Sequence, residues 1–170
     1  NARKVAKQVE NRGRKSLAIP TDVTVTSQLE NMVNKTLARF GRIDILMNNA
    51  GGVASDLMGK AMEMSEEAWD KVVDLNLKAT FLACKAVAPV MLKQGKGSIV
   101  NWSSMAGLMT FPIAAQYGAA KAGVWNLTMT LAAELAPNIR VNAVAPGSIE
   151  TPPIIERLRK NPGLKEKRLK

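Results

Sequence analysis

One tyrosine and one lysine stand out because the sequence around them is almost free of charge. Between Lys96 and Glu134 the only charged residue is Lys121, and Tyr117 is the only tyrosine in the chain. Four positions apart in a predicted helix, they lie on one helix face. A positive charge beside a phenol lowers its pKa from about 10 and so eases proton exchange. Spacing alone also allows a core tyrosine beside a lysine that extends to water.

Polar or glycine-containing turns follow three predicted strands. Ligands in open α/β sheets bind at the carboxyl ends of the strands, which is where these turns begin. These turns are Asn49-Ala50-Gly51, Ser103-Ser104 and Pro146-Gly147. We expect them to converge with the helix of Tyr117 on one crevice. A serine hydroxyl there could hold a substrate oxygen, and glycines would allow a flat ligand to approach the backbone. Taken alone, Ser103-Ser104 is also ordinary turn chemistry.

The elements that must position these residues follow from alternating hydrophobic periodicity. The pattern predicts helices over 2–11, 27–40, 72–92 and 115–136, with a kink at Pro89 and a further helix start at Ser65-Glu66-Glu67. It predicts strands at 16–19, 43–47, 98–101 and 139–144. The order αβαβααβαβ indicates parallel crossovers and a Rossmann-like, doubly wound α/β sheet. Residues 1–170 are expected to form one such domain.

The predicted sheet is smaller than a dinucleotide-binding sheet, which has about six strands. None of the 12 glycines forms a G-x-G-x-x-G phosphate loop after a strand. We therefore expect the chain to be the middle of a larger domain, cut at both ends.

Composition narrows the chemistry further. The chain of 170 residues has no histidine and one cysteine, Cys84, which excludes histidine-based triads, an internal disulfide and Cys/His metal cages. We expect no metal. The sequence shows neither a targeting segment nor a membrane span, which predicts a cytoplasmic protein that does not act at a membrane.

The formal net charge of +10 comes from the two ends of the sequence. Residues 1–15 hold six basic residues and one acidic residue, and residues 151–170 hold seven and two, with equal numbers in between. We interpret these runs as solvated helix faces. Nucleic-acid binding is the alternative, but an aromatic content of 4% leaves few rings for base stacking.

Six short motifs, in matching order and spacing over residues 1 to about 160, resemble the short-chain dehydrogenase/reductase family. Among its members, the resemblance is to reductases and dehydrogenases of the 3-oxoacyl-acyl-carrier-protein, glucose and hydroxysteroid types. The motifs are Asp22-Val23, Asn48-Asn49-Ala50-Gly51, Asp74-Leu75-Asn76-Leu77, Asn101-Trp102-Ser103-Ser104, Tyr117-Gly118-Ala119-Ala120-Lys121 and Pro146-Gly147-Ser148-Ile149-Glu150-Thr151.

This resemblance implies a catalytic role for four residues. Ser104, thirteen positions before Tyr117, has the spacing of the family's catalytic serine and is preferred to Ser103. Tyr117 would be the general acid or base on the substrate oxygen. Lys121 would lower the pKa of Tyr117 and bind the nicotinamide ribose. Asn76 would position a water in the proton relay.

The resemblance also implies NAD or NADP as cofactor and a small alcohol or ketone as substrate. The implied cofactor contacts are Asp22 and Val23 at the adenine, Asn49, Ala50 and Gly51 along the cofactor, Tyr117 and Lys121 at the ribose, and Pro146, Gly147, Ile149 and Thr151 near the nicotinamide. Loops 52–64 and 152–164 are expected to shape the substrate pocket.

Two further expectations concern the assembly of several copies of the chain and its ability to bind the cofactor. The apolar helices over 72–92 and 115–136 would pair with another copy in a dimer or tetramer. The family's first two strands, Gly-rich phosphate loop and last strand are not in the sequence. The alternative function is therefore a non-catalytic fragment or scaffold that does not bind the cofactor pyrophosphate.

Overall fold

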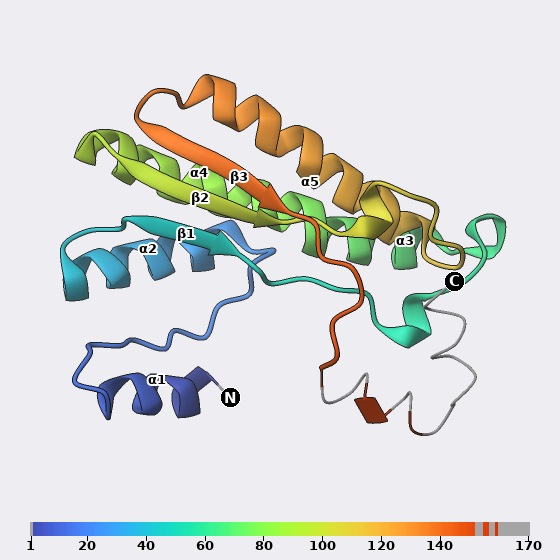
Figure 1. Ribbon diagram of the computed structural model, residues 1–170, viewed down its shortest axis with the longest axis horizontal. Helices are drawn as coiled ribbons and strands as arrows, with labels where there is room; N and C mark the ends of the chain where they lie inside the picture. Colours follow the sequence, from blue (N-terminus) through green and yellow to red (C-terminus); the bar gives the residue numbers. More distant parts are fainter. Residues whose placement is uncertain (1, 152–154, 157–158, 160–170) are drawn as a thin grey trace.

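The computed structural model describes residues 2–151, 155–156 and 159, in which helices pack on a parallel sheet (Figure 1). Over these residues the sheet has the order β1-β2-β3, with β1 at Ile45–Asn48, β2 at Gly97–Trp102 and β3 at Ile139–Val144. Both strand pairs are parallel, which confirms the predicted α/β class. The helices are α1 (Ala2–Glu10), α2 (Thr26–Phe40), α3 (Glu66–Val73), α4 (Ala79–Gln94) and α5 (Ala115–Glu134).

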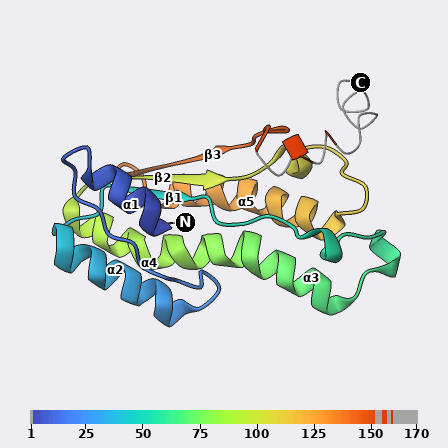
Figure 2. The ribbon, with the colours of Figure 1, turned by 90° about the horizontal axis from the view of Figure 1, so that it is seen from below.

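The hydrophobic core lies between the sheet and α4. Its buried members are Val33 from α2, Cys84, Val87 and Met91 from α4, and Ile99, Ile139 and Val141 from the strands. Figure 2 shows α2 and α4 on the same side of the strands. On the opposite face of β1, Ile45 and Met47 are 66% and 57% exposed. The described residues thus leave this face open at β1, whereas sheets of this class are usually covered on both faces.

One long helical run, Glu66–Gln94, joins α3 to α4 and differs from the two separate helices predicted. Its start is as expected, because the Ser65 hydroxyl accepts a 3.2 Å hydrogen bond from the Ala68 N–H. By length and composition alone the run could also cross a membrane, but its buried residues pack against the sheet.

A π-helical turn at Asp74–Lys78 interrupts this run. The Ala79 N–H bonds the carbonyl of Asp74, five residues back, and Asn76 lies in the middle of the turn. Pro89, where the sequence predicted a kink, lies inside α4, which continues to Gln94. Sequence periodicity missed the irregular turn because α4, which follows it, is apolar on most of its faces, so the phase shift from one extra residue leaves no mark on the apolar pattern.

The strand predicted at 16–19 is wrong, since these residues form no strand. A strand needs a neighbour to complete its hydrogen-bond ladder. In the six-strand order 3-2-1-4-5-6, the third and fourth strands are separated by two others. In that order, residues 16–19 correspond to the third strand and β1 corresponds to the fourth. The two strands that would lie between them in the sheet are not among the described residues, so residues 16–19 have no neighbouring strand. The other three strands were predicted to within two residues at each end.

The parallel register brings the carboxyl ends of all three strands to one edge. Asn48 pairs with Asn101, and Trp102 pairs with Val144. The three turns singled out in the sequence leave the sheet at this edge, and the Ser103 N–H bonds the Val144 carbonyl at 2.8 Å. The three turns therefore lie at one edge of the sheet, as the parallel order predicted.

Candidate functional site

Lys121 links α5 to the end of β2. Its side chain is 4% exposed, and its Nζ donates a 2.6 Å hydrogen bond to the carbonyl of Trp102. The Ser103 hydroxyl donates in turn to the Lys121 carbonyl at 2.8 Å. Burial lowers the pKa of Lys121 to about 8, because the charged ammonium loses hydration. The structure therefore holds this lysine in place at a desolvation cost.

Tyr117 lies one turn before Lys121 on α5, on the same face. The Lys121 Nζ is 5.6 Å from the centroid of the Tyr117 ring, which is within the range of a cation–π contact. Tyr117 is half-buried and Lys121 is buried. The pair has the arrangement that the sequence predicted.

Asn76 joins this pair from the π-helical turn. Its amide is fully buried and brackets Gly52: the Gly52 N–H donates to Oδ1, and Nδ2 donates to the Gly52 carbonyl, both at 2.8 Å. The same Nδ2 donates to the Val72 carbonyl at 2.8 Å. A Cβ on Gly51 would lie 2.7 Å from Asn76 Oδ1 and 3.5 Å from Lys121 Nζ. Gly51 therefore lies against both polar side chains, and only glycine fits there.

The two candidate serines have different surroundings. Ser103 is 2% exposed, and its hydroxyl bonds the Lys121 carbonyl. Ser104 is half-buried, and its Oγ accepts from the Ala106 N–H at 3.2 Å. An accepting oxygen keeps its own O–H free to donate. Ser104 and Tyr117 make no hydrogen bond to each other in the described part of the chain.

Two glycines to which the sequence analysis gave no role, Gly107 and Gly118, pack the serine loop onto α5. A Cβ on Gly107 would lie 2.6 Å from the Ala122 nitrogen, and one on Gly118 would lie 3.0 Å from the Ala106 carbonyl oxygen. The loop after Ser104 thus contacts α5 at Gly118 and at Ala122, on either side of Lys121. The sequence signal for them was their position: Gly107 is three residues after Ser104, and Gly118 directly follows Tyr117. Glycine is common where one backbone segment must approach another closely.

The predicted adenine contacts lie near the start of the Asn49–Gly51 stretch. Val23 and Ala50 line a small cavity together with Asn48, Ala79, Thr80 and Ala83. Asp22 accepts from the Thr24 hydroxyl at 2.6 Å and from its N–H at 2.9 Å, and these bonds lower the pKa of the Asp22 carboxyl. The Asn49 side chain is exposed.

The predicted nicotinamide loop is only partly joined to the site. The Pro146 carbonyl accepts from the Met105 N–H at 3.1 Å, which places Pro146 and Gly147 beside the serine loop. Ile149 and Thr151 are exposed and bond each other through their backbones. Most of loop 152–164 lies outside the described residues. Among those described, no three Asp, Glu or Cys side chains gather into a metal site.

Comparison with known proteins identifies the family to which the chain belongs. Residues 1–162 match the family model described as short chain dehydrogenase. The chain belongs to this family. A short-chain dehydrogenase relative from Thermotoga maritima, the 3-oxoacyl-[acyl-carrier-protein] reductase FabG, is 49% identical over 132 residues, which are 77% of this chain and 52% of that protein.

Two solved structures resemble the fold closely. One is a short-chain dehydrogenase/reductase from Burkholderia xenovorans, with a TM-score of 0.86 and 37% identity over 95% of this chain. The other is an NAD+-bound xylitol dehydrogenase, with a TM-score of 0.86 and 34% identity over 92% of this chain. This chain spans 63% and 60% of those structures and about half of the Thermotoga relative.

Proposed function

We propose that the protein is an NAD(P)-dependent oxidoreductase that interconverts an alcohol and a ketone, with Tyr117 as the group that exchanges the proton. The observation that carries the proposal is the buried Lys121 ammonium, held by the Trp102 carbonyl on the same helix face as Tyr117. A charge buried at this cost is typical of a functional site. Family membership and the relatives' printed activities support the same reaction.

Proton transfer is assigned to Tyr117 and Lys121. In the reducing direction the Tyr117 hydroxyl gives its proton to the substrate oxygen as that oxygen gains negative charge. The nearby Lys121 ammonium stabilises the phenolate that remains, and the low dielectric of its surroundings strengthens that interaction. In the oxidising direction the same phenolate takes the proton from the alcohol.

Ser104 and Asn76 support this step. The free O–H of Ser104 donates to the substrate oxygen and stabilises its developing charge. Asn76 holds Gly52, and thereby places the backbone at Gly51 against Lys121. We assign the proton path to solvent to the Asn76 region, as the family resemblance implies.

The residues fit a nicotinamide cofactor. When bound, it supplies the hydride at the carbonyl carbon. An ammonium has three N–H donors, and Lys121 uses one on Trp102, so two remain for ribose hydroxyls. Val23 and Ala50 offer an apolar contact for the adenine side. The proposed cofactor is NAD or NADP.

The test is oxidation of NADH and NADPH by the longest form of the protein that its gene encodes. The first substrate is a 3-oxoacyl thioester, the type named for the Thermotoga relative, followed by simple ketones. Tyr117→Phe should lower kcat by about 100- to 10,000-fold. Asn126→Ala, an exposed change on the same helix, is the control. A near-normal rate in Tyr117→Phe would overturn the assignment.

The scaffold alternative makes a different prediction. Titration with NADH and NADPH, followed by nucleotide fluorescence, should show saturable binding if the protein is an enzyme. A protein of native fold that binds neither nucleotide would instead be a non-catalytic scaffold.

We also propose that α4 and α5 pair with a second copy of the chain. Phe81 on α4, and Trp125 and Met129 on α5, are 43%, 38% and 53% exposed. Large apolar side chains grouped on exposed helix faces are typical of an interface. A monomer at high concentration, measured by light scattering, would contradict this proposal.

A further inference from the structure

Gln116, the residue before Tyr117, has a fully buried side-chain amide. Its Nε2 donates a 2.6 Å hydrogen bond to the carbonyl of Leu57, in the loop that follows Gly51-Gly52. Its Oε1 is buried and has no partner among the described atoms. A buried amide with an unpaired oxygen is unfavourable compared with an apolar side chain of similar size. Packing alone therefore does not account for glutamine at this position.

The same loop is tied to the start of α5 at a second point. The Gly59 N–H donates to the Ile113 carbonyl at 2.8 Å, and Gly59 forms a parallel bridge with Ala114. At its other end the loop is held by Asn76 through Gly52. Loop 52–59 is therefore fixed by two fully buried amides, one from the π-helical turn and one from α5.

The start of α5 lacks the usual means of fixing a helix end. Its N-cap, Ala114, has no side-chain hydrogen bond to the first turn. Ile113, just before it, has a φ of 64°, a left-handed conformation that strains a β-branched residue. The Gln116–Leu57 and Gly59–Ile113 bonds therefore supply what the local sequence does not. Tyr117 lies in this first turn, so its position depends on them.

We propose that Gln116 is a positioning residue, which fixes the first turn of α5 on loop 52–59 and so sets where the Tyr117 hydroxyl meets the substrate. This inference rests on the proposed function. Consecutive helical residues point about 100° apart, so Gln116 faces the loop while Tyr117 faces Lys121. A displacement of about 1 Å in a reacting group can cost about 100-fold in rate.

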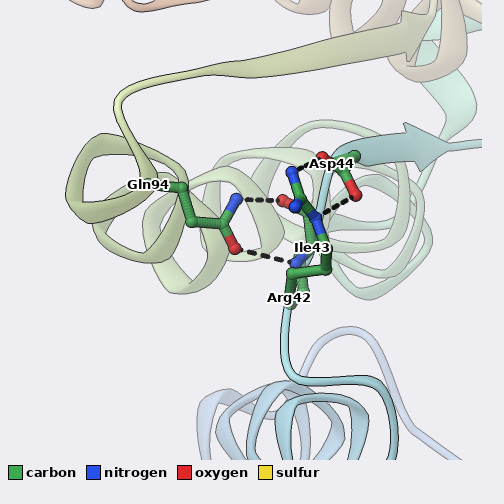
Figure 3. A network of polar contacts seen from close by, with 4 residues as sticks. All are labelled: Arg42, Ile43, Asp44 and Gln94. Atoms are coloured by element: carbon green, nitrogen blue, oxygen red, sulfur yellow. Dashed lines mark hydrogen bonds and ion pairs between the residues drawn. The ribbon is translucent and has the colours of Figure 1, made fainter.

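A matched control exists at the other end of the sheet (Figure 3). Gln94, at the end of α4, donates to the Ile43 carbonyl at 2.7 Å and accepts from the Ile43 N–H at 3.0 Å. Its amide therefore also joins a helix to a backbone segment, with two bonds instead of one. Ile43 precedes β1, so this contact is at the amino end of the strands, away from the site.

The experiment compares Gln116→Met with Gln94→Met, because methionine has a similar shape and no amide. Gln116→Met should lower kcat by about 10- to 100-fold. It should also speed hydrogen exchange at the Gly59 N–H relative to the β2 amides. Gln94→Met should lower stability and leave kcat unchanged. Equal losses of kcat in both variants, or none in Gln116→Met, would overturn the proposal.

Gln116→Glu tests the hydrogen bond that Gln116 donates to the Leu57 carbonyl. It also replaces the methionine variant in the experiment if that variant does not fold. A carboxylate cannot donate to Leu57, whereas the neutral acid can. The ratio of Gln116→Glu to wild-type kcat should therefore rise as the pH falls, and a ratio independent of pH would contradict the proposal. If the wild type reduces no substrate, the proposed function fails, and Gly59 exchange still decides whether Gln116 holds the loop.

Discussion

The side-chain amide of Asn76 bonds both backbone polar groups of Gly52, with each bond at 2.8 Å. This two-point contact joins the loop after β1 to the π-helical turn between α3 and α4. The Thr80 hydroxyl donates to the Asn76 carbonyl at 2.9 Å, so the backbone of the turn is also held by a side chain. The irregular turn and the loop therefore form one hydrogen-bonded unit.

Gly51→Ala should disrupt this unit. Its Cβ would lie 2.7 Å from Asn76 Oδ1, and the three hydrogen bonds of the Asn76 amide prevent it from moving aside. We expect kcat to fall, and the free energy of unfolding to drop by about 1–3 kcal/mol as buried polar groups lose partners. Enzyme assays and urea unfolding would measure both.

Gly52→Ala is the control for backbone strain. Gly51 and Gly52 both have positive φ, 154° and 134°, but a Cβ on Gly52 meets nothing within 4 Å. The difference between the two variants isolates the contact with Asn76. Equal effects would mean that backbone strain alone matters.

Lys121 should make the folded state more stable as the pH rises. Burial lowers its pKa from 10.5 to about 8, so its contribution is fully present above pH 10.5 and is lost as the pH falls through 8. The free energy of unfolding of the wild type, relative to Lys121→Met, should increase by about 3 kcal/mol over this range. Urea unfolding of both proteins from pH 7.5 to 10.5 measures the difference.

The titration of the Cys84 thiol cancels in this comparison. Burial raises the pKa of Cys84 to about 11, and both proteins retain this thiol. A difference that stays flat or falls with pH would show that Lys121 is hydrated in the folded state.

Cys84 should be almost unreactive in the native protein. It is 1% exposed, and it accepts a 3.3 Å hydrogen bond from Asn48 in the core beneath the site. Alkylation requires the thiolate, which a pKa of about 11 makes scarce at neutral pH. Mass spectrometry should show modification at least about 100-fold slower in buffer than in urea. Equal rates would mean that the core opens readily at α4.

The sequence was sufficient to predict what depends on local pattern. The apolar runs located β1, β2 and β3, and the parallel order brought their turns together. The spacing of Tyr117 and Lys121 placed both on one face of α5. These features follow from helix and strand periodicity alone.

What the sequence did not reveal depends on contacts between distant segments. The run 16–19 has strand character, but a strand also requires a neighbour. The π-helical turn precedes a helix that is apolar on most faces, so its phase shift is hidden in the sequence and it is recognised only from the bond between the Ala79 N–H and the Asp74 carbonyl. Gln116 gave no signal, because its partner Leu57 is 59 positions away in a loop.

The two adjacent serines should separate stability from catalysis. Ser104→Ala removes a half-buried hydroxyl that is free to donate, so kcat should fall by about 100-fold or more, whereas stability loses only the part-buried bond that this oxygen accepts from the Ala106 N–H. Ser103→Ala removes a buried hydrogen bond to the Lys121 carbonyl, which lies inside α5 and keeps its helical partner. Its free energy of unfolding should drop by about 0.5–1.5 kcal/mol, with a smaller effect on kcat. Steady-state kinetics and thermal unfolding of both variants measure this division. The reverse pattern, with kcat lost mainly in Ser103→Ala, would assign the catalytic hydroxyl to Ser103.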